Sequence, residues 1–117
     1  MFDKIGIGID VVEIKRFKKI PYKTNSRFYK KIFLTSEINY CTKFKNPYEH
    51  FAGIFAVKEA VKKSISTTID FLDIETYHSN SSPKVRIRGR YKNDYIFLVS
   101  ISHEKNIAVA VIISKKI

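Results

Sequence analysis

The hydrophobic positions of the chain predict one long helix over residues 51–64. Ile54, Val57, Val61 and Ile65 recur at helical spacing and form an apolar stripe along it. Asn46 can cap this helix, Pro47 suits its first turn, and Glu49 is an acid three residues after the cap, where a negative charge is favourable. We therefore expect this helix to pack its stripe against the rest of the protein.

A second face of the same helix carries Ala52 and Ala56, followed by Glu59 and Lys63 at i, i+4 spacing. One interpretation is an ordinary helical ion pair, which stabilises by roughly 0.2–0.5 kcal/mol. The other is that the small residues admit a closely packed backbone while the charged pair faces a buried ligand. The helix by itself leaves both interpretations open.

Alternation predicts a strand over residues 5–12. One face holds Ile5, Ile7, Ile9 and Val11, and the other holds Gly6, Gly8, Asp10 and Val12. Glycines weaken a strand unless another element must approach it closely. We expect the Ala52/Ala56 face of the helix to be that element, which would bring Asp10 towards Glu59.

The remaining pattern predicts shorter helices and further strands around the long helix. Short helices are expected over 13–20, about 28–33 and 35–44 (with Thr35 as cap), strands over 71–77 and 84–89, a loop over 78–83, and a hairpin of 95–103 with 106–113. The predicted fold class is α+β, with a small antiparallel sheet packed on a long central helix. Residues 1–117 are expected to form one domain.

Composition excludes several classes of protein. With 44% hydrophobic and 14% aromatic residues, the chain is expected to be globular. No apolar run approaches the ~20 residues of a membrane span, and no signal peptide is visible. Cys41 is the only cysteine, so an intrachain disulfide is impossible and a reducing cytoplasm fits.

The chain is strongly basic, with 22 Lys and Arg against 11 acids and a net charge of +11. This predicts an anionic partner: nucleic acid, a membrane surface, a polyphosphate or an acidic protein. Lys- and Ile-rich usage can also reflect genome base composition. The segment from Ile14 to Ser36 holds eight cations and no acid, which fits either a solvated surface or a docking face for an acidic partner.

A nucleic-acid-binding module is one alternative function. Lys84, Arg86 and Arg88 share one strand face, and the chain has seven tyrosines. This hypothesis predicts steeply salt-dependent binding to any polynucleotide. The chain carries no RNA- or DNA-binding signature, however, and the hypothesis gives Asp10 and Glu59 no role.

Candidate chemistry centres on Asp10 and Glu59. Magnesium prefers one or two carboxylates together with phosphate oxygens and retained waters, so a metal-held polyphosphate would explain acids inside a basic protein. His103 follows an apolar strand, where a structural histidine is the commoner explanation, and we assign His50 and His78 no role. The chain has no zinc-like Cys/His spacing and no Gly-x-Ser-x-Gly nucleophile motif.

Four motifs, in order and with matching spacing, resemble the holo-[acyl-carrier-protein] synthases of the 4'-phosphopantetheinyl transferase superfamily. They are Gly8-Ile-Asp-Val-Val-Glu-Ile-Lys-Arg16, Phe51-Ala-Gly-Ile-Phe-Ala-Val-Lys-Glu-Ala-Val-Lys-Lys63, Phe71-Leu-Asp-Ile-Glu75, and Ser100-Ile-Ser-His103 followed by Ala108-Val-Ala110. The resemblance covers nearly the whole chain and implies the 4'-phosphopantetheinyl transferase fold.

The resemblance also implies an activity: Mg²⁺-dependent transfer of 4'-phosphopantetheine from coenzyme A to a serine of apo-acyl carrier protein. This reaction belongs to fatty acid biosynthesis in the cytoplasm, and its by-product is adenosine 3',5'-bisphosphate. The implied partners are coenzyme A and the acidic carrier protein, without nucleic acid. The family typically forms trimers with active sites shared between neighbouring subunits. A homologue that keeps the fold and only binds carrier protein is a further alternative, against which the joint presence of Asp10, Glu59 and Lys63 argues.

The implied site residues follow from the motifs. Asp10 and Glu59 match the family's magnesium ligands, Lys63 matches its phosphate-contacting catalytic lysine, and Arg16 matches its carrier-docking arginine. The positions implied to bind coenzyme A are Lys62, Lys63, Pro83, Ser102 and His103. The general base stays open; a water held by the metal or by Glu59 would serve.

The chain departs from the family pattern in three places. Ile54 stands where many relatives have arginine, which removes one possible phosphate contact. Residues 64–68 lack the usual glycines, and the loop before Lys84 lacks the usual glycine before proline. We hypothesise that one of four cations makes the phosphate contact that the arginine makes in relatives: Lys43, Lys45, Lys62 or Arg86.

Overall fold

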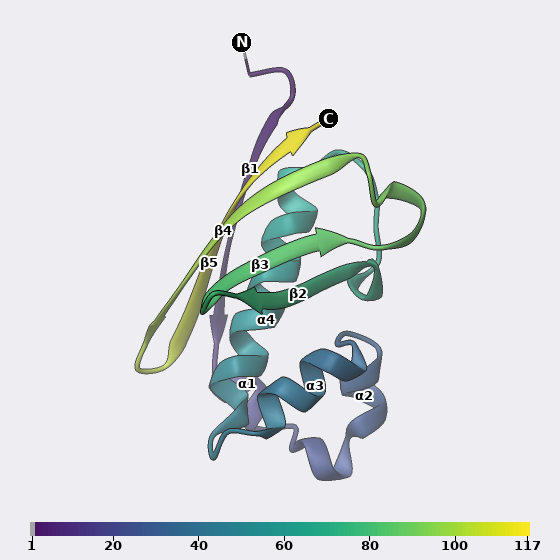
Figure 1. Ribbon diagram of the computed structural model, residues 1–117. Coiled ribbons are helices and arrows are strands. Elements are labelled where there is room, and N and C mark those ends of the chain that lie inside the picture. Colours follow the sequence, from purple (N-terminus) through teal and green to yellow (C-terminus); the bar gives the residue numbers. More distant parts are fainter. Residues whose placement is uncertain (1) are drawn as a thin grey trace.

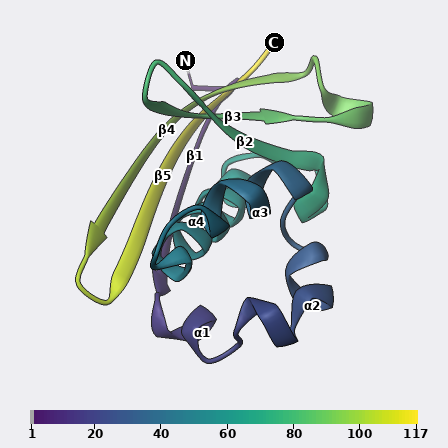
Figure 2. The same cartoon turned by 60° about the horizontal axis from the view of Figure 1, so that its bottom comes forward.

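The protein is an α+β fold built around one helix, as a computed structural model describes it for residues 2–117. Helix α4 (Pro47–Ser64) lies across a three-stranded antiparallel sheet, with a two-stranded hairpin and the short helices packed on its other sides (Figures 1 and 2). The predicted fold class is therefore confirmed. Within residues 2–117, no helix combines the length and apolarity required to cross a membrane.

The larger sheet has the strand order β1-β5-β4. Its strands are β1 (Ile5–Glu13), β4 (Tyr95–Glu104) and β5 (Ile107–Lys116). The last two form the predicted hairpin, and Lys105 turns the chain between them with a φ of 42°. Every neighbouring pair in this sheet is antiparallel.

The second sheet is the hairpin of β2 (Ile74–Ser79) and β3 (Ser82–Ile87). The prediction of a loop over residues 78–83 is wrong, because both strands continue into that region. Only Asn80 and Ser81 turn the chain, with φ values of 52° and 65°. Two successive positive φ angles are what a tight two-residue hairpin needs, and asparagine tolerates them well. The predicted strand over 71–77 begins later, at Ile74, after a 3₁₀ turn over Phe71–Asp73.

The short helices cluster near the amino end of α4 (Figure 1). They are α1 (Lys15–Lys18), α2 (Ser26–Lys30) and α3 (Thr35–Thr42), with further 3₁₀ turns over Tyr22–Thr24 and Gly89–Tyr91. The cap of α3 is Leu34 rather than the predicted Thr35, and the Glu37 side chain accepts a 2.7 Å hydrogen bond from the Leu34 N–H. Asn46 occupies the predicted cap of α4 without a side-chain hydrogen bond.

Helix α4 is buried on nearly all of its faces, whereas the predicted apolar stripe required only one buried face. Ile54, Val57 and Val61 are buried as expected, and so are Ala52 and Ala56 on the second face. A cluster of aromatic rings covers the amino-terminal half of the helix, with ring centroids 4.6–6.0 Å apart; its members are Phe17, Tyr29, Phe33, Phe51 and Phe55. The helix is thus the centre of the core.

The glycines of β1 are where the sheet meets this helix. A side chain at Gly8 would overlap the carbonyl oxygen of Ala60, and one at Gly6 would overlap that of Ser64. The close approach predicted from the glycines is correct, but the partner is the later pair of small residues rather than Ala52 and Ala56. Small residues continue at i+4 spacing to Ala60 and Ser64, and β1 packs on that later half.

We expect Gly8→Ala to destabilise the protein by about 3 kcal/mol, because the new methyl group meets main-chain atoms that cannot rotate away. Urea unfolding at fixed protein concentration measures this change. Gly53→Ala is the matched control: its methyl group would lie 3.1 Å from the movable His103 ring, and alanine favours a helix. Equal stability of Gly8→Ala and the wild type would contradict the close contact.

Candidate active site

Asp10 and Glu59 line the same pocket, although they lie far apart in the sequence. Asp10 comes from β1 and Glu59 from α4, and the contact of Gly8 with Ala60 brings these elements together. The pocket has a volume of about 370 Å³. Its other lining residues are one cation and an apolar wall: Arg16, Val11, Phe17, Phe28, Ile32, Phe55 and Phe71. A polar edge therefore faces an apolar wall.

Lys63 is joined to the Asp10 edge of this pocket. Its Nζ atom donates hydrogen bonds to Asp10 Oδ1 at 3.1 Å and to the Ile9 carbonyl at 3.2 Å. Within residues 2–117, the ion pair of Lys63 is thus made with Asp10 and not with Glu59. The Asp10 side chain is 14% exposed whereas that of Lys63 is 54% exposed. The ammonium group can therefore turn towards a ligand, while the carboxylate stays in place.

Two carboxylates on neighbouring elements fit a magnesium ion better than a zinc ion. Zinc sites use three or four protein ligands, whereas magnesium takes one or two carboxylates and completes its shell with water and phosphate oxygens. The part of the chain that the structure describes contains no group of three or more His, Cys, Asp or Glu residues able to hold a metal. The donor set of Asp10 and Glu59 thus fits Mg²⁺ with a phosphate ligand.

Arg16 lines the same pocket, whereas Lys62 lines a neighbouring pocket that shares Phe71 with it. The Arg16 guanidinium lies 5.1 Å from the centroid of the Phe55 ring, and Arg16 itself lines the pocket wall. The Lys62 ammonium lies 3.6 Å above the Phe71 ring, whose residue belongs to the same wall. Both are cation–π contacts. Arg16 is exposed at the Asp10–Glu59 pocket, and Lys62 is half-buried in the neighbouring one.

The other predicted coenzyme A residues lie elsewhere on the chain. His103 and Ser102 are on β4, separated from β1 by β5, so that two strand spacings of roughly 10 Å in total intervene. His103 Nε2 lies 3.3 Å from the Glu49 carbonyl, and Ser102 points to the opposite face of the sheet. Pro83 lies in β3. The predicted coenzyme A residues thus form one group on α4, Lys62 and Lys63, and another on strands β3 and β4, none of which lines the Asp10–Glu59 pocket.

The three histidines of the chain gather around the amino end of α4. The His50 ring stacks on Phe44 at 3.8 Å, and the His78 ring stacks on Tyr40 at 4.6 Å. Burial lowers the pKa of His50, and the charges of His103 and His78 lower it further against the opposing effect of Glu49. Nothing in the sequence indicated this gathering, because it depends on the β2–β3 hairpin reaching over α3.

The four cations predicted to replace the missing arginine occupy different places. Ile54 lines a pocket of about 290 Å³ together with Lys43, Tyr77 and His78. Arg86 instead forms an ion pair with Glu75 at 2.9 Å. Lys62 lines the pocket next to the Asp10–Glu59 pocket, and Lys45 is exposed on the turn before α4. Lys43 is thus the cation that shares a pocket with Ile54.

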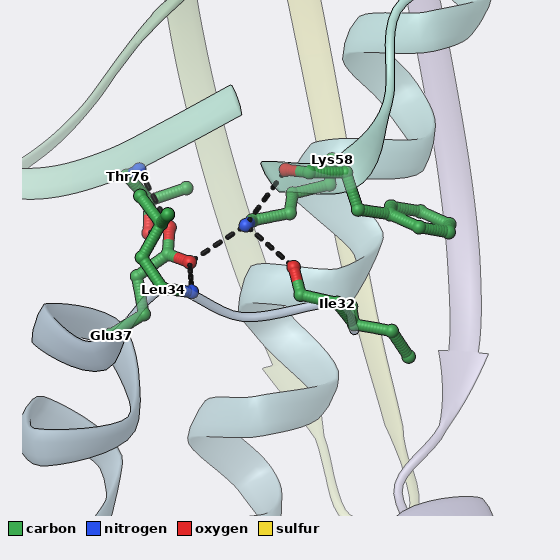
Figure 3. A network of polar contacts seen from close by, with 6 residues as sticks. Ile32, Leu34, Glu37, Lys58 and Thr76 are labelled. Atoms are coloured by element: carbon green, nitrogen blue, oxygen red, sulfur yellow. Dashed lines mark hydrogen bonds and ion pairs between the residues drawn. The ribbon is translucent and has the colours of Figure 1, made fainter. Parts of the chain in front are cut away.

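The sequence did not predict the buried ion pair of Glu37 with Lys58, whose charged atoms are 2.7 Å apart (Figure 3). The Lys58 and Glu37 side chains are 0% and 1% exposed. Burial lowers the pKa of Lys58, and the Glu37 carboxylate opposes this shift. Removing one partner from such a pair costs about 3–5 kcal/mol. A lysine within an otherwise buried stretch of helix was the available signal, because it requires a buried acid.

Comparison with known proteins places these features in a family. The model of the 4'-phosphopantetheinyl transferase superfamily matches residues 6–112. A holo-[acyl-carrier-protein] synthase of Thermodesulfovibrio yellowstonii is 42% identical, over 92% of this chain and 96% of its own length. That of Chlamydia felis is 41% identical, over 92% of this chain and 94% of its own.

Solved structures agree with this assignment. The holo-[acyl-carrier-protein] synthase of Helicobacter pylori, solved in complex with coenzyme A, has a TM-score of 0.79 at 33% identity, covering 93% of this chain and 99% of that one. The Bacillus anthracis enzyme has a TM-score of 0.80 at 33% identity, covering 96% and 97%. The chain therefore belongs to the holo-[acyl-carrier-protein] synthase family of the 4'-phosphopantetheinyl transferase superfamily, a family of transferase enzymes.

Proposed function

We propose that this protein transfers 4'-phosphopantetheine from coenzyme A to a serine of apo-acyl carrier protein, in cytoplasmic fatty acid biosynthesis. The observation that carries the proposal is the single pocket lined by both Asp10 and Glu59 in a protein of net charge +11. Relatives with this activity in their names, one of them solved with coenzyme A, support it. The products are holo-carrier protein and adenosine 3',5'-bisphosphate.

Asp10 and Glu59 would hold Mg²⁺, which when bound neutralises the diphosphate of coenzyme A and polarises the phosphorus under attack. The serine oxygen of the carrier protein forms the new bond to the phosphorus that carries pantetheine, and its proton passes to a base, for which a water held by the metal or by Glu59 would serve. The bond to the bridging diphosphate oxygen breaks, and adenosine 3',5'-bisphosphate leaves. Because the nucleophile belongs to the carrier protein, the enzyme needs no catalytic serine. The work of its residues is alignment and charge stabilisation.

Lys63 has the geometry to stabilise the departing phosphate. Its ammonium group is half exposed and is held at the pocket edge by Asp10 and the Ile9 carbonyl. A short rotation about the side chain would direct it towards the negative charge that develops on the leaving oxygen. Because these hydrogen bonds already restrict the lysine side chain, little further conformational entropy is lost when it contacts the phosphate.

The carrier protein would dock beside Arg16. The groove next to the Asp10–Glu59 pocket is lined by three exposed cations, Lys15, Arg16 and Lys19, and by Glu13, whose carboxylate lies 3.2 Å from the Lys15 ammonium. An acidic carrier surface on these cations would direct its serine towards the neighbouring pocket, and opposite charges would speed the encounter. This assigns the basic segment before Ser36 to partner recognition.

We further propose a homotrimer with active sites shared between subunits. Coenzyme A binding is assigned to Lys62 and Lys63 in one group and to Pro83, Ser102 and His103 in another, and one chain keeps these groups apart. A neighbouring copy that supplies the second group would complete the site.

The outer face of the larger sheet supports this assembly. It is apolar and open to solvent, with seven large side chains that are 42–69% exposed: Ile5, Ile7, Ile9, Val11, Ile96, Leu98 and Ile113. A contiguous apolar face on a soluble domain marks an interaction surface. A second copy of this chain is the occupant that joins the two groups of site residues.

Incubation of the protein with apo-carrier protein, coenzyme A and Mg²⁺ tests the activity directly. Mass spectrometry should show the carrier gaining one 4'-phosphopantetheine group, and EDTA should abolish the gain. We expect Asp10→Asn and Glu59→Gln to lose at least about 100-fold in kcat while circular dichroism shows an unchanged fold. Full turnover by either variant would refute its role as a metal ligand.

The trimer predicts that Ile7→Lys dissociates the assembly, because a charge in an apolar interface lacks a partner. Light scattering should show the mass of three chains in the wild type and of one chain in the variant, with loss of transfer activity. Ile117→Lys is the matched control, since both isoleucines are 69% exposed and Ile117 lies outside the sheet. A trimeric Ile7→Lys variant would exclude this face from the interface.

A further inference from the structure

We propose that the buried Glu37–Lys58 pair is a positioning device that holds the apolar wall of the Asp10–Glu59 pocket. This inference rests on the proposed function for its kinetic consequence and on the geometry alone for its structural one. Lys58 and Glu59 are adjacent on α4, so their side chains leave the helix about 100° apart. Glu59 faces the pocket, while Lys58 enters the core behind the wall.

The three N–H groups of the Lys58 ammonium have three acceptors. One is Glu37 Oε1 at 2.7 Å, and the others are the main-chain carbonyls of Ile32 at 2.8 Å and of Phe71 at 3.1 Å (Figure 3). Ile32 and Phe71 are both wall residues of the Asp10–Glu59 pocket. The Lys58 ammonium is therefore hydrogen-bonded to the main chain of two wall residues, Ile32 and Phe71, while its own side chain lies in the core.

Glu37 uses both carboxylate oxygens in the same way. Oε1 accepts the Leu34 N–H at 2.7 Å, and Oε2 accepts the N–H and the hydroxyl of Thr76, each at 2.8 Å. Two of these donors are main-chain N–H groups, one at the cap of α3 and one within β2, and the third is the Thr76 side chain. Together the two side chains tie the segment before α3, the turn at Phe71 and strand β2 to the central helix.

This arrangement differs from an ordinary core contact. An apolar replacement of the pair would leave the buried Ile32 carbonyl and the partly buried N–H groups of Leu34 and Thr76 without these partners, so packing alone cannot substitute for it. The wall would then shift towards solvent or towards the pocket. Because in-line transfer depends on alignment, a shift of about 1 Å costs on the order of 100-fold in rate.

Lys58→Met, which keeps the side-chain length without the charge, tests the proposal. We expect hydrogen exchange to rise selectively in residues 31–34 and 71–76, and kcat to fall by roughly 10- to 100-fold. The KM for coenzyme A should stay within about twofold, since alignment rather than binding is lost. Ile87→Ala is the control for stability: it removes a core residue, 3% exposed, that does not line this pocket.

Glu37→Gln provides a second variant in case Lys58→Met does not fold. Glutamine retains one acceptor oxygen, but its NH₂ group cannot accept the Thr76 N–H. We expect exchange to rise around residue 76 and kcat to fall less than in Lys58→Met. A folded variant of either kind whose kcat and exchange pattern match those of Ile87→Ala would overturn the proposal. If the wild type transfers nothing, the proposed function fails, and the exchange experiment still decides whether the pair holds the wall.

Discussion

The contact between the bare backbone of β1 and the small residues of α4 is the constraint on which the rest of the site depends. Gly6 and Gly8 let the strand lie against the carbonyls of Ser64 and Ala60, closer than any side chain would permit. Asp10 follows Gly8 by two positions and so emerges on the same face of the strand, beside the helix that carries Glu59. Two acids from distant parts of the sequence thereby share one pocket without either being drawn from a flexible loop. Backbone packing brings the two carboxylates together although their like charges repel.

The architecture then separates two tasks. The polar edge of the pocket carries Asp10 and Glu59, with Lys63 paired to Asp10, which is where the proposed function needs charge beside a phosphate. The opposite wall is apolar, and its backbone is anchored from behind by Lys58 and Glu37. The same helix thus presents one charge to the pocket and another to the core. The acids offset only part of the surrounding positive charge, which remains available to coenzyme A and to an acidic carrier protein.

Much of this fold followed from periodicity. The alternation of residues 5–12 and the helical stripe after Asn46 identified the two elements that meet at the site, and the glycines indicated that they meet closely. Periodicity does not specify which turn of a helix packs against a strand, so Ala52 and Ala56 were expected to contact β1 where Ala60 and Ser64 do.

The β2–β3 turn was missed because Asn80 and Ser81 are polar residues that suit both loops and tight hairpins. Local patterns could not pair Glu37 with Lys58. A glutamate such as Glu37 is common near the start of a helix, and a lysine such as Lys58 is common on an exposed helix face. The roles of individual site residues came from resemblance to a family, and spacing alone left them open.

We propose above all that Asp10 and Glu59 jointly bind one divalent cation together with the diphosphate of coenzyme A. Crystals grown with coenzyme A and Mn²⁺, which is also a hard cation and scatters anomalously, test it most directly. The account predicts an anomalous peak roughly 2.0–2.2 Å from a carboxylate oxygen of each acid and from a diphosphate oxygen. Coenzyme A bound in the crystal with the manganese peak elsewhere, or touching neither carboxylate, would contradict it.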